Sequence, residues 1–244
     1  MKTKITIMSV LSGEFHSMNA LKILTILNLV IGMIEFLNID CMEYMKGLED
    51  NAFDLAIVDP PYGDEKQLGG RPSGKLYHGK DKSWNLAPSQ EYFDELKRVS
   101  VNQIVWGGNY FASKLGNSRC YVIWKKNIPE KASFSSVEYA WASFNSAPSY
   151  IEAQVAGRRG FFTVDGERIH PTQKPIKLYV ELLKNYAKEG DRILDTHLGS
   201  GSSAIAAHYG GFDFVGCELD KHYFEASQER FVRETSQLAF EYGE

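Results

Sequence analysis

Four consecutive residues, Asp59-Pro60-Pro61-Tyr62, place a carboxylate, a rigid backbone and an aromatic ring directly after the apolar run Phe53–Val58. Because proline has no N–H to donate to a neighbouring strand, the chain must leave a sheet at this point. We therefore expect the motif at the carboxyl edge of a buried parallel strand, where open α/β folds bind ligands. A carboxylate and a fixed carbonyl beside a stacking ring suit a planar group with an exocyclic amine.

A second stretch, Arg192–Ser203, runs from a strand pattern through a Gly-Ser-Gly turn into a helix pattern. Gly199 and Gly201 let the backbone approach a ligand closely, and a helix that starts there presents free N–H groups. Glu218 ends the next apolar run, where a carboxylate can bind ribose hydroxyls. A packing turn with a helix cap is the alternative. The first motif offers nothing suited to hydride transfer, so S-adenosylmethionine fits better than NAD as the adenosine cofactor.

The elements that must position these motifs alternate between strand and helix patterns from Glu35 onward, which predicts a mostly parallel sheet covered on both faces. The expected strands are Phe36–Ile39, Leu55–Val58, Gln103–Trp106, Tyr121–Trp124, Tyr139–Ser143, Arg192–Leu194 and Phe214–Cys217. The expected helices are Ser89–Val99, Ile176–Ala187, Ser202–His208 and Lys221–Glu234. Two segments are expected to be loops, Gly63–Pro88 and Ile128–His170, the second with one strand inside.

The 244 residues, 43% hydrophobic and 24% charged, are typical of one soluble α/β domain. A net charge of -4 means that any binding to nucleic acid must use local basic patches. Cys41, Cys120 and Cys217 form no CxxC pair, which disfavours a zinc site or disulfides and favours a reducing, cytoplasmic location.

Residues 1–35 are expected to be an N-terminal extension of uncertain role, with 36–244 as the catalytic domain. The uncharged run Ile23–Ile34 is too short to span a bilayer, so no membrane association is expected. A packing helix, an added extension and a signal peptide are all compatible with this stretch, and Met33 is a possible true start of the protein.

Three motifs in order make the chain resemble the DNA amino-methyltransferases of the β arrangement, over about Phe36 to Arg230. They are Ile57–Tyr62, His170–Pro175 and Ile193–Gly201. The resemblance implies an α/β, Rossmann-like, doubly wound, seven-stranded S-adenosylmethionine-dependent methyltransferase fold with one antiparallel strand.

The resemblance also implies site residues. The implied catalytic residues are Asp59, Pro60, Pro61 and Tyr62, in which Asp59 and the Pro60 carbonyl accept hydrogen bonds from the target amine. Tyr62 would stack on the base after it is flipped from the duplex. The implied cofactor-binding residues are Asp40, Cys41, Thr172, Lys174, Asp195, His197, Gly199, Ser200, Gly201 and Glu218.

Within that cofactor set, Asp40 and Cys41 match the family's adenine contact, and Thr172 and Lys174 match the segment near the methionine end. His197 departs from the family, which commonly has Phe there, so the cofactor would meet a more polar ring. A metal-binding role for His197 lacks a partner at ligand spacing, and no metal is expected.

Basic residues in two stretches are candidates for contact with DNA phosphates. They are Lys66, Arg71, Lys75, Lys80, Lys82, Lys125, Lys126, Arg158 and Arg159. A solvated loop is the alternative for the first five. Residues 128–168 correspond to the family's target-recognition region and form a short insertion here. Trp106–Phe111 and Trp124–Asn127 would either shape the base pocket or pack strand ends.

These observations predict a site-specific DNA methyltransferase that moves a methyl group from S-adenosylmethionine to an exocyclic base amine. Asp59 at the head of its motif favours adenine N6. The alternatives are cytosine N4, RNA or a protein side chain as acceptor, and a non-catalytic DNA-binding relative. The expected partner is double-stranded DNA, a homodimer is possible, and restriction–modification is one possible role.

Overall fold

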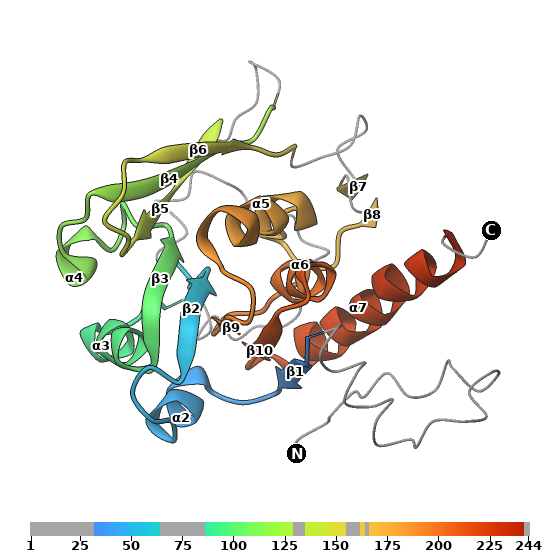
Figure 1. Ribbon diagram of the computed structural model, residues 1–244, viewed down its shortest axis with the longest axis horizontal. Helices are drawn as coiled ribbons and strands as arrows, with labels where there is room; N and C mark the ends of the chain where they lie inside the picture. Colours follow the sequence, from blue (N-terminus) through green and yellow to red (C-terminus); the bar gives the residue numbers. More distant parts are fainter. Residues whose placement is uncertain (1–31, 64–85, 129–134, 155–161, 164–165, 242–244) are drawn as a thin grey trace.

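A computed structural model describes residues 32–63, 86–128, 135–154, 162–163 and 166–241 (Figure 1). Its centre is an eight-stranded sheet with strand order β1-β10-β9-β2-β3-β5-β4-β6. The strands are β1 (Ile34–Leu37), β2 (Phe53–Val58), β3 (Ser100–Trp106), β4 (Cys120–Lys125), β5 (Val137–Ala142), β6 (Ser149–Glu152), β9 (Arg192–Asp195) and β10 (Asp213–Cys217). A separate two-stranded hairpin pairs β7 (Phe162–Thr163) with β8 (Gly166–Glu167).

Strand directions confirm the expected fold class. Every neighbouring pair in the large sheet is parallel except the two pairs made by β5, which runs antiparallel to β3 and β4. The sheet has eight strands rather than the expected seven because β6 adds to its edge, parallel to β4.

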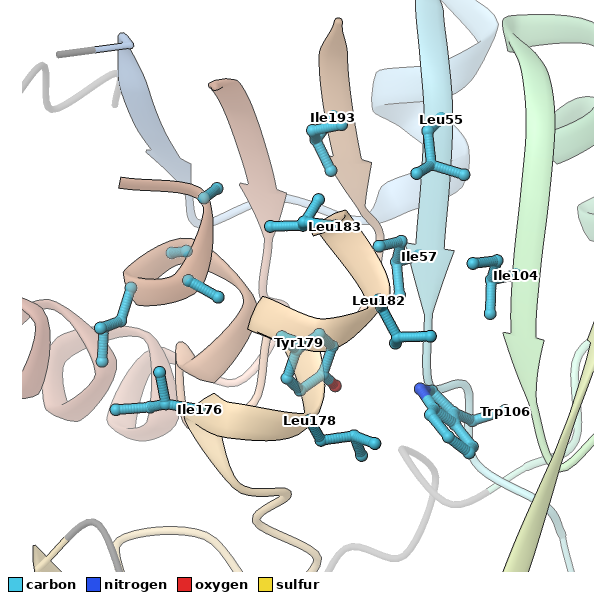
Figure 2. Close-up of a cluster of buried hydrophobic side chains, with 14 of the residues drawn as sticks. Leu55, Ile57, Ile104, Trp106, Ile176, Leu178, Tyr179, Leu182, Leu183 and Ile193 are labelled. Carbon is cyan, nitrogen blue, oxygen red and sulfur yellow. The ribbon is translucent and has the colours of Figure 1, made fainter. Parts of the chain in front are cut away.

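Helices cover both faces of the sheet. The core layer that contains α2 (Cys41–Lys46), α3 (Gln90–Val99) and α4 (Ala112–Leu115) is separate from the layer with α5 (Ile176–Tyr186), α6 (Ser202–Gly210) and α7 (Lys221–Glu241). Side chains of β2 alternate between them: Leu55 and Ile57 join the α5–α6 layer, whereas Ala56 and Val58 join the α2–α3 layer. Figure 2 shows Leu182 of α5 next to Ile57 of β2. The strand that carries the first motif is thus buried on both faces.

Two helices have clear local causes in the sequence. The side chain of Ser89 accepts a hydrogen bond from Tyr92 N and so caps the start of α3. The first turn of α5 follows Pro175, whose ring is compatible with a helix start. Apolar residues at helical spacing in α5, including Tyr179 and Leu182, are buried against the sheet.

Several elements differ from the expectation. β6 forms inside the segment expected to be a loop, and only Ile151 of its four residues is buried, so its pattern is weak. The short helices α2 and α4 were also not expected. β1 begins at Ile34, two residues before the expected strand Phe36–Ile39. Residues 1–31 and most of the loop expected over 63–88 lie outside the described residues.

The reversal of strand order between β9 and β2 creates the point where ligands bind in open α/β sheets. From β9 the chain passes through α6 to β10 on one side, whereas from β2 it passes through α3 to β3 on the other. The two crossovers therefore leave in opposite directions and open a crevice at the carboxyl ends of β2 and β9.

No helix among the described residues is long and apolar enough to cross a membrane.

Candidate functional site

Direct pairing of β2 with β9 brings the two predicted motifs together. Leu55 lies opposite Ile193 and Ala56 opposite Leu194, in parallel register. Asp59 follows the last residue of β2, and Asp195 is the last residue of β9. Motifs more than a hundred residues apart in the sequence thus meet at the carboxyl edge of the sheet.

The carboxylate of Asp59 has a protein donor on each oxygen. The Tyr62 hydroxyl donates to Oδ1 over 2.8 Å, and the Lys174 ammonium lies 2.5 Å from Oδ2. Burial, together with the charge of Asp59, raises the pKa of Tyr62 well above its usual value, so the phenol keeps its proton and remains a donor. The acceptor predicted for a target amine is therefore already held in a fixed orientation.

A second carboxylate extends this interaction. Glu138 on β5 lies with Oε2 3.3 Å from Lys174 Nζ and with Oε1 2.5 Å from Lys126 Nζ. Burial alone would lower the pKa of Lys174, but Asp59 and Glu138 outweigh burial and raise it. Burial would likewise raise the pKa of Glu138, but Lys174 and Lys126 hold it below its usual value. The four residues form a charge row in which two carboxyl side chains alternate with two lysines, in the order Asp59, Lys174, Glu138, Lys126.

For three members of the charge row the structure shows contacts that the sequence did not predict. Lys126 was expected at a DNA surface, but its side chain is 11% exposed and pairs with Glu138. Lys174 was expected near the cofactor, and it contacts Asp59. Glu138 was missed altogether, because it lies one residue before the expected strand Tyr139–Ser143. Lys125, by contrast, is half exposed and pairs with Glu152.

A cavity of about 190 Å³ lies beside Tyr62. Its lining residues are Tyr62, Gly107, Asn109, Tyr110, Lys126, Ser135, Val137, Glu138 and Tyr139. The Tyr110 ring stacks on the Tyr62 ring with centroids 5.0 Å apart and planes 22° apart. The segment after β3, expected either to shape a base pocket or to pack a strand end, thus contributes three of the lining residues.

The glycine turn after β9 is held by carboxylates. Gly199 and Gly201 have φ of +53° and +74°, a region that favours glycine. Gly199 N donates to Glu218 Oε2 over 2.8 Å, while Asp220 N donates to Oε1. Burial raises the pKa of Glu218.

The start of α6 and the side chains next to it complete this turn. No side chain caps the N-terminus of α6, so its first amides remain available as donors. Ser200 is buried, with its hydroxyl 3.2 Å from that of Ser202. Bare backbone, free amides and a half-buried carboxylate at Glu218 fit the polar groups of a ribose-bearing cofactor.

Asp195 is buried, whereas His197 is partly buried and packs against Tyr92. Asp195 accepts hydrogen bonds from Ser203 Oγ at 2.6 Å and from His197 N at 3.0 Å, and burial raises its pKa to about 7. The His197 ring meets Tyr92 edge to face, with its Nδ1 2.9 Å from Thr196 Oγ1. Burial lowers the pKa of His197 to about 4, so the ring is neutral at pH 7 and packs as an aromatic side chain.

The remaining predicted cofactor residues have local partners. Asp40 caps α2, where its Oδ1 accepts from Met42 N over 2.7 Å. Burial, with a contribution from Asp40, raises the pKa of Cys41 to about 12, so it remains a thiol. Thr172 is exposed, with its hydroxyl 3.1 Å from His170 Nδ1.

The other DNA candidates, Lys66, Arg71, Lys75, Lys80, Lys82, Arg158 and Arg159, lie outside the described residues. Within the described ranges no His, Cys, Asp or Glu cluster could hold a metal ion.

Comparisons with known proteins agree with this geometry. The N6/N4 methyltransferase family model, described as "DNA methylase", matches residues 121–229. The chain is 26% identical to the Escherichia coli K12 protein named "Putative methylase YubD", over 82% of this chain and 91% of that protein. It is 24% identical to the type II methyltransferase M.HpaI of Haemophilus parainfluenzae, over 80% of this chain and 73% of the relative. The crystal structure of an M1.HpyAVI–SAM complex has the same fold, with a TM-score of 0.55, 20% identity, and coverage of 81% of this chain and 98% of that one.

Proposed function

We propose that this chain, which is similar to DNA amino-methyltransferases, methylates the N6 amine of adenine in double-stranded DNA, with S-adenosylmethionine as the donor. The observation that carries the proposal is the pairing of β2 with β9, which joins the Asp59 acceptor to the glycine turn. Methyl transfer needs an acceptor nitrogen and a methyl donor held side by side, and this crevice joins a site suited to each.

At the acceptor site, Asp59 and the Pro60 carbonyl would accept hydrogen bonds from the amine, and Tyr62 would stack on a base flipped out of the duplex. Two fixed acceptors orient the nitrogen lone pair and stabilise the positive charge that develops on that nitrogen in the transition state. The cavity beside Tyr62 offers space next to this ring for a base.

At the donor site, Glu218 would bind the ribose hydroxyls, and the turn of Gly199 and Gly201 would lie against the cofactor. Bound S-adenosylmethionine supplies an electrophilic methyl group. His197 would present a neutral ring in place of the family's usual Phe, since its pKa lies near 4. The named M1.HpyAVI structure is a complex with this cofactor, which supports the choice.

The choice of adenine as the acceptor base rests on the Asp at the start of the Asp59–Tyr62 motif and on the order of the motifs. The matching family includes both N6 and N4 methyltransferases, and both amines accept a methyl group by the same chemistry. The test must therefore identify the methylated nucleoside itself.

We would incubate the full chain with labelled S-adenosylmethionine and unmethylated mixed-sequence duplex, then identify methylated nucleosides by mass spectrometry. N6-methyladenine is expected, and N4-methylcytosine would correct the base only. Label in RNA or in protein, but not in DNA, would overturn the proposal. Asp59→Ala should abolish transfer and leave cofactor binding intact, whereas Glu49→Ala, at an exposed position distant from the site, should change neither.

A further inference from the structure

The Lys174 ammonium lies between two carboxylates. Its Nζ is 2.5 Å from Asp59 Oδ2 and 3.3 Å from Glu138 Oε2. The side chain is only 5% exposed, so the ammonium cannot exchange either partner for bulk water without opening the site. Two anionic positions are thus available to one buried cation. Which of them it occupies matters for the proposed function, on which this inference rests.

In the free protein the ammonium occupies the position that a target amine needs. Tyr62 donates to Oδ1 of Asp59 and Lys174 to Oδ2, so both oxygens already accept from the protein. An exocyclic amine that bound Oδ2 would share this oxygen with the ammonium. The amine nitrogen also becomes positive as the new N–C bond forms, and a cation on the same oxygen opposes that charge. Movement of the ammonium away from Asp59 would remove this opposition and leave Oδ2 to the amine.

Glu138 provides the place for it to go. Its Oε2 is buried and accepts no hydrogen bond of good geometry from the described residues, although Lys174 Nζ lies 3.3 Å away. Its other oxygen, Oε1, is held by Lys126 at 2.5 Å, which fixes the carboxylate in place. A short movement of Nζ toward Oε2 would turn this 3.3 Å ion pair into a charge-assisted hydrogen bond of good geometry.

The Lys174 backbone is anchored, so the movement is confined to the side chain. Its carbonyl accepts a 2.7 Å hydrogen bond from the hydroxyl of Ser202, the first residue of α6 after the glycine turn. The Trp106 ring lies 5.5 Å from Nζ and can attract the ammonium by a cation–π interaction. The Lys174 side chain can therefore move while its backbone stays bonded to Ser202, next to the glycine turn predicted to bind the cofactor.

We propose that Lys174 is a positioning residue that occupies Asp59 in the free enzyme and moves to Glu138 when the target amine binds. Lys174 keeps the Asp59 carboxylate oriented until the base arrives. Glu138 then receives the ammonium, so that a cation no longer shares the acceptor oxygen with the reacting nitrogen. Lys126 serves this exchange by holding Glu138 rather than by contacting DNA.

The test is a double-mutant cycle on methyl transfer to unmethylated plasmid DNA. Glu138→Gln removes the receiving charge but keeps the side-chain size, so kcat should fall about tenfold or more with cofactor affinity unchanged. Lys174→Met removes the competing ammonium, so the double variant should regain kcat relative to Glu138→Gln alone. A role in stability alone would give additive losses, and a double variant as slow as the product of the single effects would overturn the proposal.

Controls separate this inference from its premise and from misfolding. The exposed pair Lys46–Glu91, with atoms 2.7 Å apart, gives a matched cycle, Lys46→Met with Glu91→Gln, that should show no coupling in kcat. If Glu138→Gln does not fold, Glu138→Asp replaces it: the shorter side chain withdraws the acceptor from Nζ, and Lys174→Met must again restore kcat. Wild-type protein that transfers no methyl group to DNA would refute the proposed function, whereas an active wild type with an additive cycle refutes only the exchange.

Discussion

Gly107 lies against the ring of Tyr62 so closely that a Cβ atom at position 107 would fall 2.3 Å from Tyr62 Cε1. The backbone of Gly107 also has φ of +70°, which disfavours any side chain. The residue after β3 therefore sets where the ring of the Asp59–Tyr62 motif can lie. Because Tyr62 also donates to Asp59 Oδ1, a displaced ring would disturb the acceptor carboxylate as well.

Gly107→Ala should reduce methyl transfer more than its loss of stability explains. The strained φ alone costs on the order of 1 kcal/mol, and the added methyl group must also push the Tyr62 ring aside. Chemical denaturation and kcat would be measured together. Gly190→Ala is the matched control, because Gly190 has φ of +86° and no atom of the described residues lies within 4 Å of where its Cβ would stand. Equal kcat in the two variants would show that Gly107 does not position the ring.

Tyr62→Phe and Tyr62→Ala should separate the two roles of this side chain. Phe keeps the ring but loses the 2.8 Å hydrogen bond to Asp59, so kcat should fall while duplex affinity stays close to wild type. Ala also removes stacking on the flipped base, worth roughly 1–3 kcal/mol, so the apparent affinity for duplex should fall as well. Steady-state kinetics on duplex DNA measures both effects, and identical kcat and KM for the two variants would argue against base stacking.

Glu218→Ala should weaken binding of S-adenosylmethionine by about 10- to 100-fold, since hydrogen bonds to a charged group contribute roughly 1.5–3 kcal/mol. The change removes both the predicted ribose acceptor and the acceptor that holds Gly199 N. Isothermal titration calorimetry gives the dissociation constant. Glu225→Ala, an exposed acid on α7, is the control and should bind the cofactor as wild type does. Unchanged affinity in Glu218→Ala would remove this residue from the ribose site.

His197→Phe should make the protein less sensitive to acid. The pKa of His197 is about 4 in the folded protein, below the usual 6.5 of the unfolded chain. Above pH 6.5 both states are neutral and the stability contribution is fully present. As pH falls from 6.5 to 4 the unfolded state takes up a proton first, so up to about 3 kcal/mol of stability is lost. Urea unfolding at pH 7.5, 5.5 and 4.5 should show a shallower decline for His197→Phe, and parallel curves would contradict the assignment.

Elements with strong local signals were predictable from the sequence. β2 combines an apolar run with two prolines that end it, and α5 has apolar residues at helical spacing after Pro175, so both were expected within a residue or two of their bounds. β6 was not, since four residues with one buried side chain carry almost no periodicity. Its strand conformation comes from pairing with β4, a tertiary effect.

The candidate site divides in the same way. Some site residues belong to motifs that directly follow a strand pattern, so their position at a strand end was predictable. They are Asp59, Tyr62 and Gly199. Glu138 reaches Lys174 only because β5 runs antiparallel between β3 and β4, and that register places Glu138 opposite Trp124. No local sequence pattern predicts this contact between distant residues, so the charge row could be found only in the structure.

Pairing of β2 with β9 also constrains when the protein becomes active during its synthesis. The strand that leads to Asp59 leaves the ribosome well before Ile193 and Leu194, its partners in the sheet, have been added. Until then one edge of β2 has no neighbour, and the glycine turn that faces Asp59 does not exist. The two motifs therefore come together only late in translation, after β9 has been added.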